Sequence, residues 1–444
     1  MVGRDRALSI VTKAVEFSEA DQTEAVVRVT DAYLTRFSSN YIHQNVGEHN
    51  VQLSVRVALG KRLGSASTNA VDEQGIRECV QRALRIARVQ EENPDFASFP
   101  APEPIPEVGG YFEETAECTP DRRAEGVARI IDAASSRGLQ AAGAFSTAAA
   151  ELAVANSLGV RAYHRWTTAA LNTVIMSDEG SGWAAALAGQ VGDIDPQAVA
   201  SRAIDKCLRS AHPAALEPGE YEVVLEPAAV ATLMGFLARL GFSALAVQEG
   251  RSFLCGKIGQ RIVDERITMW DDATDPAGIP MAFDFEGVPK RRLSLLRRGV
   301  AENVVHDSFT AGREGKKSTG HAIPGGFGEP MPTHLFVASG EATLEEMIAS
   351  TRRGILVTRF HYVNPVHPVK TIITGMTRDG TFLIENGRVT RPVKNFRFTE
   401  SILNALNQVE LVGKDRELHG GRLGGIMVPA LKLRRFHFTG VTEF

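Results

Sequence analysis

The sequence offers few of the residues that could hold a catalytic metal ion. Metal-dependent hydrolases commonly take two histidine ligands from one helix and a third ligand from elsewhere, with a carboxylate serving as base. None of the eleven histidines lies between His212 and His306, and the apolar helical segment 227–247 has Arg239 as its one charged residue. We therefore expect no metal-bound water on that helix.

A late group of histidines is the remaining source of metal ligands. His361 and His367 share a segment with two prolines, which favours a loop, and His419 follows further along the chain. A six-residue spacing in a proline-containing loop is not a recognised ligand geometry. A metal site on these three histidines is therefore an outside alternative.

Neither a nucleophile nor a phosphate loop is specified by the sequence. Ser181 lacks a G-x-S-x-G frame, and Cys255 has no identified base beside it. The segment 312–318 superficially suggests a phosphate loop, but Thr310 stands where that pattern needs a glycine. A charged surface loop is the better interpretation of this segment.

Composition and charge exclude several classes of protein. The 444 residues include 49 Lys and Arg against 53 Asp and Glu, a net charge of −4, so no strong field favours nucleic acid. The basic residues 290–292 and 297–298 could bind an acidic tail or phosphate, but alternation along a hairpin sends neighbours to opposite faces, so the charges do not form one surface and a solvated hairpin is expected. The charged N-terminus is wrong for a signal peptide, no apolar stretch reaches the ~20 residues of a membrane span, and the four cysteines show no disulfide framework. We expect a cytoplasmic protein with no membrane or nucleic-acid partner.

Hydrophobic patterns predict an α+β fold that must position the few polar candidates. Residues 1–92 predict an N-terminal α+β domain, in which a helix over 4–20 precedes a meander that turns at residues 46–48. Asp72 then caps an amphipathic helix with one apolar face for packing on that sheet. The strands expected in the meander are residues 24–30, 32–37, 51–59 and 63–67.

A proline-rich linker follows over residues 93–118. Its five prolines remove backbone donors and favour extended conformations that neither a helix nor a central strand tolerates. Phe96, Phe99 and Ile105 give the linker apolar side chains that can tuck against the surface it crosses.

Two further units complete the predicted organisation. Residues 119–216 predict a central α+β domain whose helices begin with a cap residue followed by proline. Residues 217–444 predict a large β-rich C-terminal domain containing one long buried helix over 227–249. Asn386-Gly387 predicts a hairpin turn, and the capping box at Thr343 predicts a short helix.

Four short motifs follow one another in the C-terminal half of the chain: Ser318-Thr319-Gly320-His321-Ala322, Gly354-Ile355-Leu356-Val357-Thr358, Leu383-Ile384-Glu385-Asn386-Gly387-Arg388-Val389 and Pro392-Val393. In this order and spacing the chain resembles the TldD/PmbA family. Members of that family have long been described as modulators of DNA gyrase, and also as zinc metalloproteases with non-catalytic partner subunits. The resemblance covers nearly the whole chain.

The resemblance also places the chain within the family. The active branch carries an H-E-x-x-x-H helix early in the C-terminal domain and a late cysteine that completes a zinc site. The equivalent helix here, over 227–249, has no histidine, and no cysteine follows Cys255. The chain therefore resembles the PmbA, or TldE, branch, so we expect no catalytic residue and no cofactor in this chain, with zinc in a TldD-type partner.

The PmbA-like branch implies a heterodimer with a TldD-like metalloprotease subunit, or a homodimer, that acts on unfolded or extended peptides. Edge strands or the loop at residues 320–328 would help to hold the peptide, and the substrate-loop candidates are Ser318, Thr319, Gly320 and His321. Segment 359–368 departs from the family, which commonly has a glycine-rich loop there. Two alternatives stay open: a peptidase active by itself through His361, His367 and His419, and a gyrase- or DNA-interacting modulator.

Overall fold

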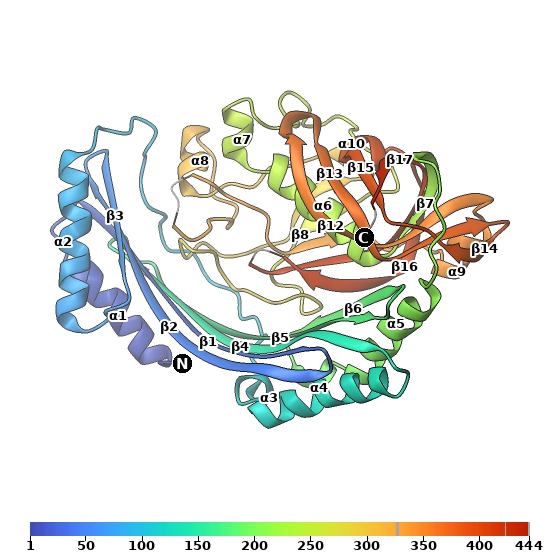
Figure 1. Cartoon of the computed structure of the whole chain (residues 1–444). Coiled ribbons are helices and arrows are strands. Elements are labelled where there is room, and N and C mark those ends of the chain that lie inside the picture. The colour runs from blue at the N-terminus through green and yellow to red at the C-terminus, as the bar shows by residue number, and fades with distance from the viewer. Residues whose placement is uncertain (326–327, 422, 443–444) are drawn as a thin grey trace.

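A long, curved antiparallel sheet forms the base of the molecule (Figure 1). In this computed structural model, residues 1–325, 328–421 and 423–442 are described. Six of the described strands form the sheet: β1 (Gln22–Ser38), β2 (Tyr41–Leu59), β3 (Arg62–Thr68), β4 (Gln140–Asn156), β5 (Arg161–Met176) and β6 (Ser181–Ala188). Their order is β3-β2-β1-β4-β5-β6, so strands from both sides of the proline-rich linker share one sheet.

Helices cover the convex face of this sheet (Figure 1). Alternate residues of β1, among them Ala25 and Val27, are buried beneath the helices near the N-terminus. Asp72 caps the second helix by accepting a hydrogen bond from the Gly75 backbone N–H at 2.7 Å, as predicted. The helices of this layer are α1 (Arg4–Glu16), α2 (Glu73–Val89), α3 (Glu113–Ala116), α4 (Pro120–Ser135) and α5 (Pro196–Arg209), and the 3₁₀ turn η1 spans Val191–Asp193.

The first hairpin differs from the sequence prediction. The turn expected at residues 46–48 lies in the middle of β2, and the chain turns instead at residues 39–40, which both have positive φ. Asn40 holds this turn in place, because its side-chain oxygen accepts the Ala141 N–H at 2.6 Å. Gly47 serves another purpose: a Cβ there would lie 3.0 Å from a ring carbon of Tyr33 on the neighbouring strand. This glycine makes room for an aromatic ring rather than for a turn.

The proline-rich linker lies along the inner side of the molecule, where its apolar side chains are covered. Phe96 and Phe99 are buried and pack with Ala58 of β2 and Phe309 of the C-terminal domain. Ile105 packs against the apolar layer between the curved sheet and that domain. The expectation that these side chains tuck in is confirmed.

A second sheet organises the C-terminal domain. Eleven of the described strands belong to it, and β17 pairs with β7, β11, β15 and β16. Strand β12 pairs in parallel with β7 and antiparallel with β13. The strands are β7 (Gly219–Leu225), β8 (Met269–Asp271), β9 (Leu293–Arg297), β10 (Val300–Ala301), β11 (Leu335–Val337), β12 (Arg353–His367), β13 (Ile372–Glu385), β14 (Arg388–Pro392), β15 (Phe396–Ser401), β16 (Val409–Gly420) and β17 (Gly425–Val441).

One apolar helix packs on this second sheet, but it is shorter than predicted. Its side chains join the largest apolar core, which confirms the buried helix. The helix ends at Gly241, which packs against the Phe253 ring so closely that a Cβ there would lie 2.0 Å from a ring carbon. The helices of the domain are α6 (Pro227–Gly241), α7 (Ala244–Gln248), α8 (Ser308–Arg313), α9 (Leu344–Ala349) and α10 (Ile402–Leu406), and the 3₁₀ turn η2 spans Pro368–Lys370.

Local turn and capping signals in this domain are confirmed. Asn386 and Gly387 have positive φ and join β13 to β14, and Thr343 accepts the Glu346 N–H to begin α9. The hairpin from β9 to β10 turns at Arg298-Gly299, and β10 has only two residues.

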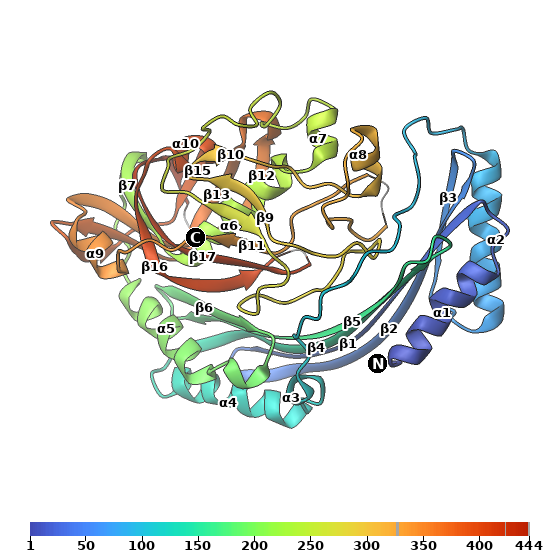
Figure 2. The same cartoon turned by 180° about the vertical axis from the view of Figure 1, so that it is seen from behind.

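The C-terminal domain lies on the concave side of the curved sheet (Figure 2). Leu152 and Val154 of β4 and Trp166 of β5 meet Met281 and Phe283 in an apolar layer between the two parts. The α+β class, with a large β-rich C-terminal domain, is confirmed. No helix in the described ranges has both the length and the apolar character needed to cross a bilayer.

Candidate functional site

One stripe of α6 faces open space instead of the core. Leu233, Met234 and Leu237 point into the core, whereas a stripe at helical spacing on the other side stays half-buried or exposed. Two cavities border this stripe, one toward the curved sheet and one toward the start of β17. The residues of this α6 stripe are Ala228, Thr232, Gly235 and Arg239.

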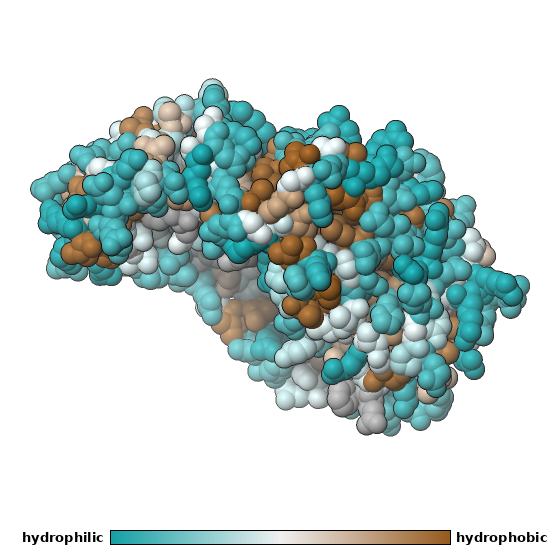
Figure 3. Space-filling model, turned by 90° about the horizontal axis from the view of Figure 1, so that it is seen from above, coloured by the Kyte–Doolittle hydropathy of each residue, from teal (hydrophilic) through white to brown (hydrophobic). Residues whose placement is uncertain are grey.

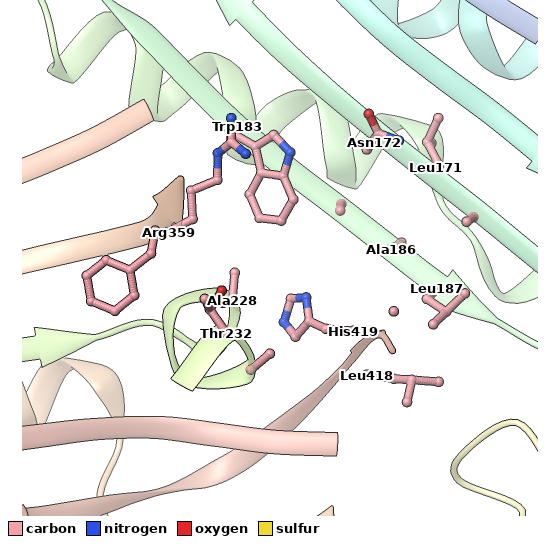
Figure 4. A pocket seen from close by; sticks show the side chains of 15 residues that line it. Leu171, Asn172, Trp183, Ala186, Leu187, Ala228, Thr232, Arg359, Leu418 and His419 are labelled. Atoms are coloured by element: carbon pink, nitrogen blue, oxygen red, sulfur yellow. Dashed lines mark hydrogen bonds between the residues drawn. The ribbon is translucent and has the colours of Figure 1, made fainter. Parts of the chain in front are cut away.

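The first cavity lies between α6, strands β5 and β6 of the curved sheet, and strands β12 and β16 (Figure 4). Its volume is about 390 Å³, and much of its lining is alanine and leucine. Its polar or aromatic lining residues are Asn172, Trp183, Thr232, Arg359, Phe360 and His419. The arrangement suits a ligand that is mainly apolar and has one or two polar groups.

Arg359 is held rigidly at the wall of this cavity. Its guanidinium lies over the Trp183 ring, 5.1 Å from the centroid, and its Nε donates to Asp379 Oδ2 at 2.8 Å. Ser181 of β6 donates to Asp379 Oδ1 at 2.7 Å. The carboxylate therefore links the curved sheet to the C-terminal domain, and Ser181 acts as a structural hydrogen-bond donor.

His419 is a neutral side chain inside the same cavity. Burial lowers its pKa to about 4, and the nearby Arg202 guanidinium acts in the same direction. Glu417 lies 3.6 Å from Nε2 but is largely exposed, so its attraction does not offset the burial. Among the described residues, this buried Nε2 has no hydrogen-bond partner.

The second cavity, of about 330 Å³, lies beside the C-terminal half of α6. Gly235 and Arg239 form one side, and Met331 and Thr333 form part of the other. Arg239 is its exposed charged group. The α6 stripe therefore presents Ala228 and Thr232 to the first cavity, and Gly235 and Arg239 to the second.

The substrate-loop candidates lie beside a buried polar centre. Ser318 and Thr319 are half-buried, and the Ser318 hydroxyl donates to the His306 carbonyl at 3.2 Å. Gly320 has a φ of +75°, and a Cβ there would lie 2.6 Å from the Pro289 carbonyl oxygen. His321 is fully buried, so its side chain faces the protein interior. Residues 326 and 327 of the predicted loop lie outside the described residues.

Asp271 is the centre of this buried group, which the sequence analysis did not identify. One of its carboxylate oxygens accepts the backbone N–H groups of Thr333 and His334 at 2.7 and 2.8 Å. The other lies 3.0 Å from His321 Nε2 and 3.9 Å from Lys290 Nζ. Burial alone would raise the pKa of Asp271, but Lys290 and His321 outweigh it and hold the pKa below its ordinary value. An acidic residue at the end of the short strand β8, after two apolar residues, was the available signal.

The prediction that residues 290–292 are all solvated is wrong for Lys290. Its side chain is 3% exposed and faces Asp271, whereas Arg291 and Arg292 keep the exposure expected of a hairpin. Residues 290–292 precede β9 and are not part of a strand; Lys290 ends the buried segment 281–290, whereas Arg291 and Arg292 lie beyond it. A partner carboxylate then makes the burial of this lysine possible.

The three late histidines do not assemble into a metal site. The predicted loop around His361 and His367 is wrong: both lie in β12, which passes through Pro365 at one of three shifts in register with β13. Prolines are tolerated at such irregular positions. Across the described ranges, no group of three or more His, Cys, Asp or Glu side chains could hold a metal ion, so His419 has no metal-binding partners.

The zinc that the family resemblance implies does not fit the residues of α6. Zinc is bound by cysteine sulfur, histidine nitrogen or carboxylate oxygen. The α6 stripe offers two residues without polar side chains, the hydroxyl of Thr232 and the cation of Arg239. This set of side chains cannot replace the ligands of the active branch.

Solved structures share this fold over nearly the whole chain. TldE from Thermococcus kodakarensis matches 98% of this chain and 100% of its own, with a TM-score of 0.90 and 22% identity. A Thermotoga maritima protein named as a candidate modulator of a DNA gyrase matches 94% of this chain and 96% of its own. Its TM-score is 0.84 at 19% identity. These matches establish the shared fold.

Sequence comparisons then give the family. The profile of the PmbA/TldA metallopeptidase C-terminal domain matches residues 218–440, and that of PmbA/TldA metallopeptidase domain 1 matches residues 24–87. Metalloprotease PmbA of Escherichia coli O157:H7 is 25% identical over 95% of each chain. An uncharacterized Methanocaldococcus jannaschii protein is 27% identical over 82% of this chain and 86% of its own. The chain belongs to the PmbA/TldD family, which confirms the resemblance.

We predict that Asp271→Ala lowers the free energy of unfolding by about 3–5 kcal/mol, because it leaves Lys290 buried without its partner. Urea unfolding followed by circular dichroism measures the loss. The exposed Asp178→Ala is the matched control and should change stability by less than about 0.5 kcal/mol. Adding Lys290→Met to Asp271→Ala should recover part of the loss. An Asp271→Ala variant as stable as the wild type would contradict the assigned role.

A second prediction concerns pH and His419. Between pH 6.5 and 4 the unfolded chain binds a proton on this histidine that the folded chain does not, so stability falls as pH drops. The slope is up to about 1.36 kcal/mol per pH unit, which amounts to about 1.5 kcal/mol between pH 6.5 and 5. His419→Gln should therefore lose about 1.5 kcal/mol less than the wild type between pH 6.5 and 5, measured by urea unfolding at both values. The exposed His437→Gln should lose as much as the wild type.

Proposed function

We propose that this chain is the non-catalytic, PmbA/TldE-type subunit of a zinc-dependent proteolytic complex that acts on unfolded or extended peptides. The zinc would belong to a TldD-like partner subunit. The observation that carries the proposal is the α6 stripe: the helix is present in a metallopeptidase-family C-terminal domain, but its accessible residues are not zinc ligands. The names of two relatives, metalloprotease PmbA and TldE, support the choice of branch.

The contribution of this chain to proteolysis would be to hold the peptide. Strand β2 pairs with β3 only over residues 53–59, so among the described strands residues 41–52 form an open sheet edge. An extended peptide can add to such an edge through main-chain hydrogen bonds, which gives broad sequence tolerance. The larger cavity beside α6 is lined by β5 and β6, across β1 and β4 from this edge, so it would accept side chains of another part of the peptide, and its apolar lining suits hydrophobic residues.

The end of the β12–β13 hairpin is the surface that we propose contacts the partner. Tyr362, Val366 and Val369 are 75%, 57% and 45% exposed, and they lie within eight positions of one another. Hydrophobic side chains gather on the side of the molecule seen from above (Figure 3), where this hairpin projects in Figure 1. Exposed apolar groups that gather in this way are typical of protein interfaces.

Reconstitution tests the proposed role directly. The purified chain alone should cleave an unstructured peptide no faster than buffer, and addition of a TldD-type subunit carrying H-E-x-x-x-H should give cleavage that a zinc chelator abolishes. The matched control is the TldD-type subunit alone, which should be slower than the pair. Robust zinc-dependent cleavage by this chain alone would overturn the proposal and would support the alternative of a peptidase that is active by itself through an atypical metal site. A steeply salt-dependent affinity for duplex DNA would instead favour the modulator alternative.

Substitution at the hairpin end tests the partner surface. Val366→Asp should weaken association with the TldD-type subunit at least tenfold, because a charge would be buried in an apolar contact. Leu208→Asp, on the solvent side of α5, is the matched control and should leave the dissociation constant unchanged. Analytical ultracentrifugation of each variant with the partner gives both values. A Val366→Asp variant that associates normally would exclude this surface, and self-association of the wild type lost in this variant would indicate a homodimer.

A further inference from the structure

The concave face of the curved sheet carries a compact polar group at its β1–β3 end. Cross-strand pairing brings Glu24 beside Arg56 and then Ser65, and places Arg28 beside Gln52. Alternation sends these side chains to the face opposite the α1 and α2 helices. Ser54 and Ser67 pair with each other two positions away from Arg56 and Ser65, so their side chains lie on the same face. Three neighbouring strands therefore build one polar surface.

A cavity of about 420 Å³ covers this surface. Its floor is the polar group on β1, β2 and β3, and its roof comes from the C-terminal domain through Phe285, Glu286 and residues 323–325. In Figure 2 the same end of the sheet faces the loops around α8. The cavity is separate from the two that border the α6 stripe.

The two arginines of this cavity, Arg56 and Arg28, differ in their ion-pair and hydrogen-bond partners. Arg56 is engaged on both sides: its guanidinium lies 2.5 Å from Glu24 and 2.9 Å from Glu286, so it ties the sheet to the roof. Arg28 has no ion-pair partner in the described part of the chain, and its Nε is buried there without a hydrogen-bond acceptor. A buried guanidinium N–H without an acceptor is costly, so a bound anion would relieve it.

The balance of charge in the cavity favours a single negative charge on the ligand. Burial raises the pKa of Glu24 to about 8; Arg56 opposes this, and the neighbouring Glu286 and Asp284 add to it. Glu24 therefore keeps a proton near neutral pH, and its second oxygen is fully buried without a partner among the described residues. With Glu286 paired to Arg56, the charge of Arg28 remains unbalanced.

We propose that this cavity, named here the Arg28 pocket, binds a carboxylate carried by an extended peptide. The guanidinium fork of Arg28 matches the two oxygens of a carboxylate, and Gln52, Ser54 and Ser67 supply uncharged polar groups around it. A phosphate with two negative charges suits the pocket less well, because Glu286 and Glu24 line the same wall. The choice of a peptide as carrier rests on the proposed function, whereas the carboxylate site rests on the pocket itself.

Peptide binding to the isolated full-length chain tests the Arg28 pocket without any partner. The probes are N-acetylated alanine pentapeptides labelled with a fluorophore: one with a free C-terminus, one amidated, and two amidated peptides with a central Glu or Gln. Fluorescence anisotropy should show at least tenfold tighter binding of a carboxylate-bearing peptide than of its neutral match. The free C-terminus and the central Glu distinguish a terminal from a side-chain carboxylate.

Substitutions then assign the binding to Arg28. Arg28→Gln should remove the tenfold preference for the carboxylate, and Arg28→Lys should retain part of it. Arg36→Gln is the matched control, because Arg36 is an exposed arginine on the same strand and outside the pocket. In the wild type the preference should also fall as pH rises through about 8, when Glu24 loses its proton beside Arg56, Glu286 and Asp284.

The outcomes separate this proposal from the proposed function. No preference for carboxylate peptides in the wild type, or a preference unchanged by Arg28→Gln, would overturn the Arg28 pocket even if the reconstituted pair cleaves peptides. A preference that depends on Arg28 would support the pocket even if no cleavage is reconstituted. Equal loss in Arg28→Gln and Arg36→Gln would show a general charge effect and would also overturn the assignment.

Discussion

The buried contacts of the Arg56 guanidinium with two carboxyl groups fix how the curved sheet meets the C-terminal domain. Arg56 lies on β2, yet it contacts Glu24 on β1 and Glu286 in the facing domain, and Glu286 in turn accepts the Ser308 N–H at the start of α8. Charged hydrogen bonds of this kind are directional, and losing one partner leaves a buried charge. They therefore specify one orientation of the two parts, while the apolar layer between them supplies most of the attraction.

The other end of the interface repeats this arrangement with different residues. Ser181 of the curved sheet, Asp379 and Arg359 form a chain of hydrogen bonds across to β12. With polar attachments at both ends, the cavities between the sheet and the domain have fixed walls. Fixed walls lower the conformational entropy lost on binding, which matters for a ligand as flexible as an extended peptide.

The sequence predicted the elements better than their pairing. Caps such as Asp72 and Thr343 and the Asn386-Gly387 turn are local, so their chemistry could be recognised directly. The first turn was misplaced because Gly47 has a packing role that only the cross-strand Tyr33 explains. Likewise, nothing local in the sequence shows that strands before and after the proline-rich linker join in one sheet.

The polar groups of the sites were harder to predict for the same reason. Asp271, Lys290 and His321 lie far apart in the sequence and meet only through the fold of the C-terminal domain. Arg28 and Gln52 are joined by strand register, which composition and periodicity do not reveal. What could be recognised was the set of side chains on α6, because a helix fixes which of its residues share a face.

The structure also explains how a metallopeptidase fold can persist with an α6 that cannot bind zinc. In domains where a structural metal supplies the folding free energy, loss of the ligands unfolds the chain. Here α6 is anchored by Leu233, Met234 and Leu237, which lie on the face opposite the accessible stripe and are buried in the largest apolar core. Burial of each such side chain contributes about 1.5–3 kcal/mol. Stability and the capacity to bind metal therefore depend on different faces of the same helix, so residues on the accessible face can change without loss of the fold.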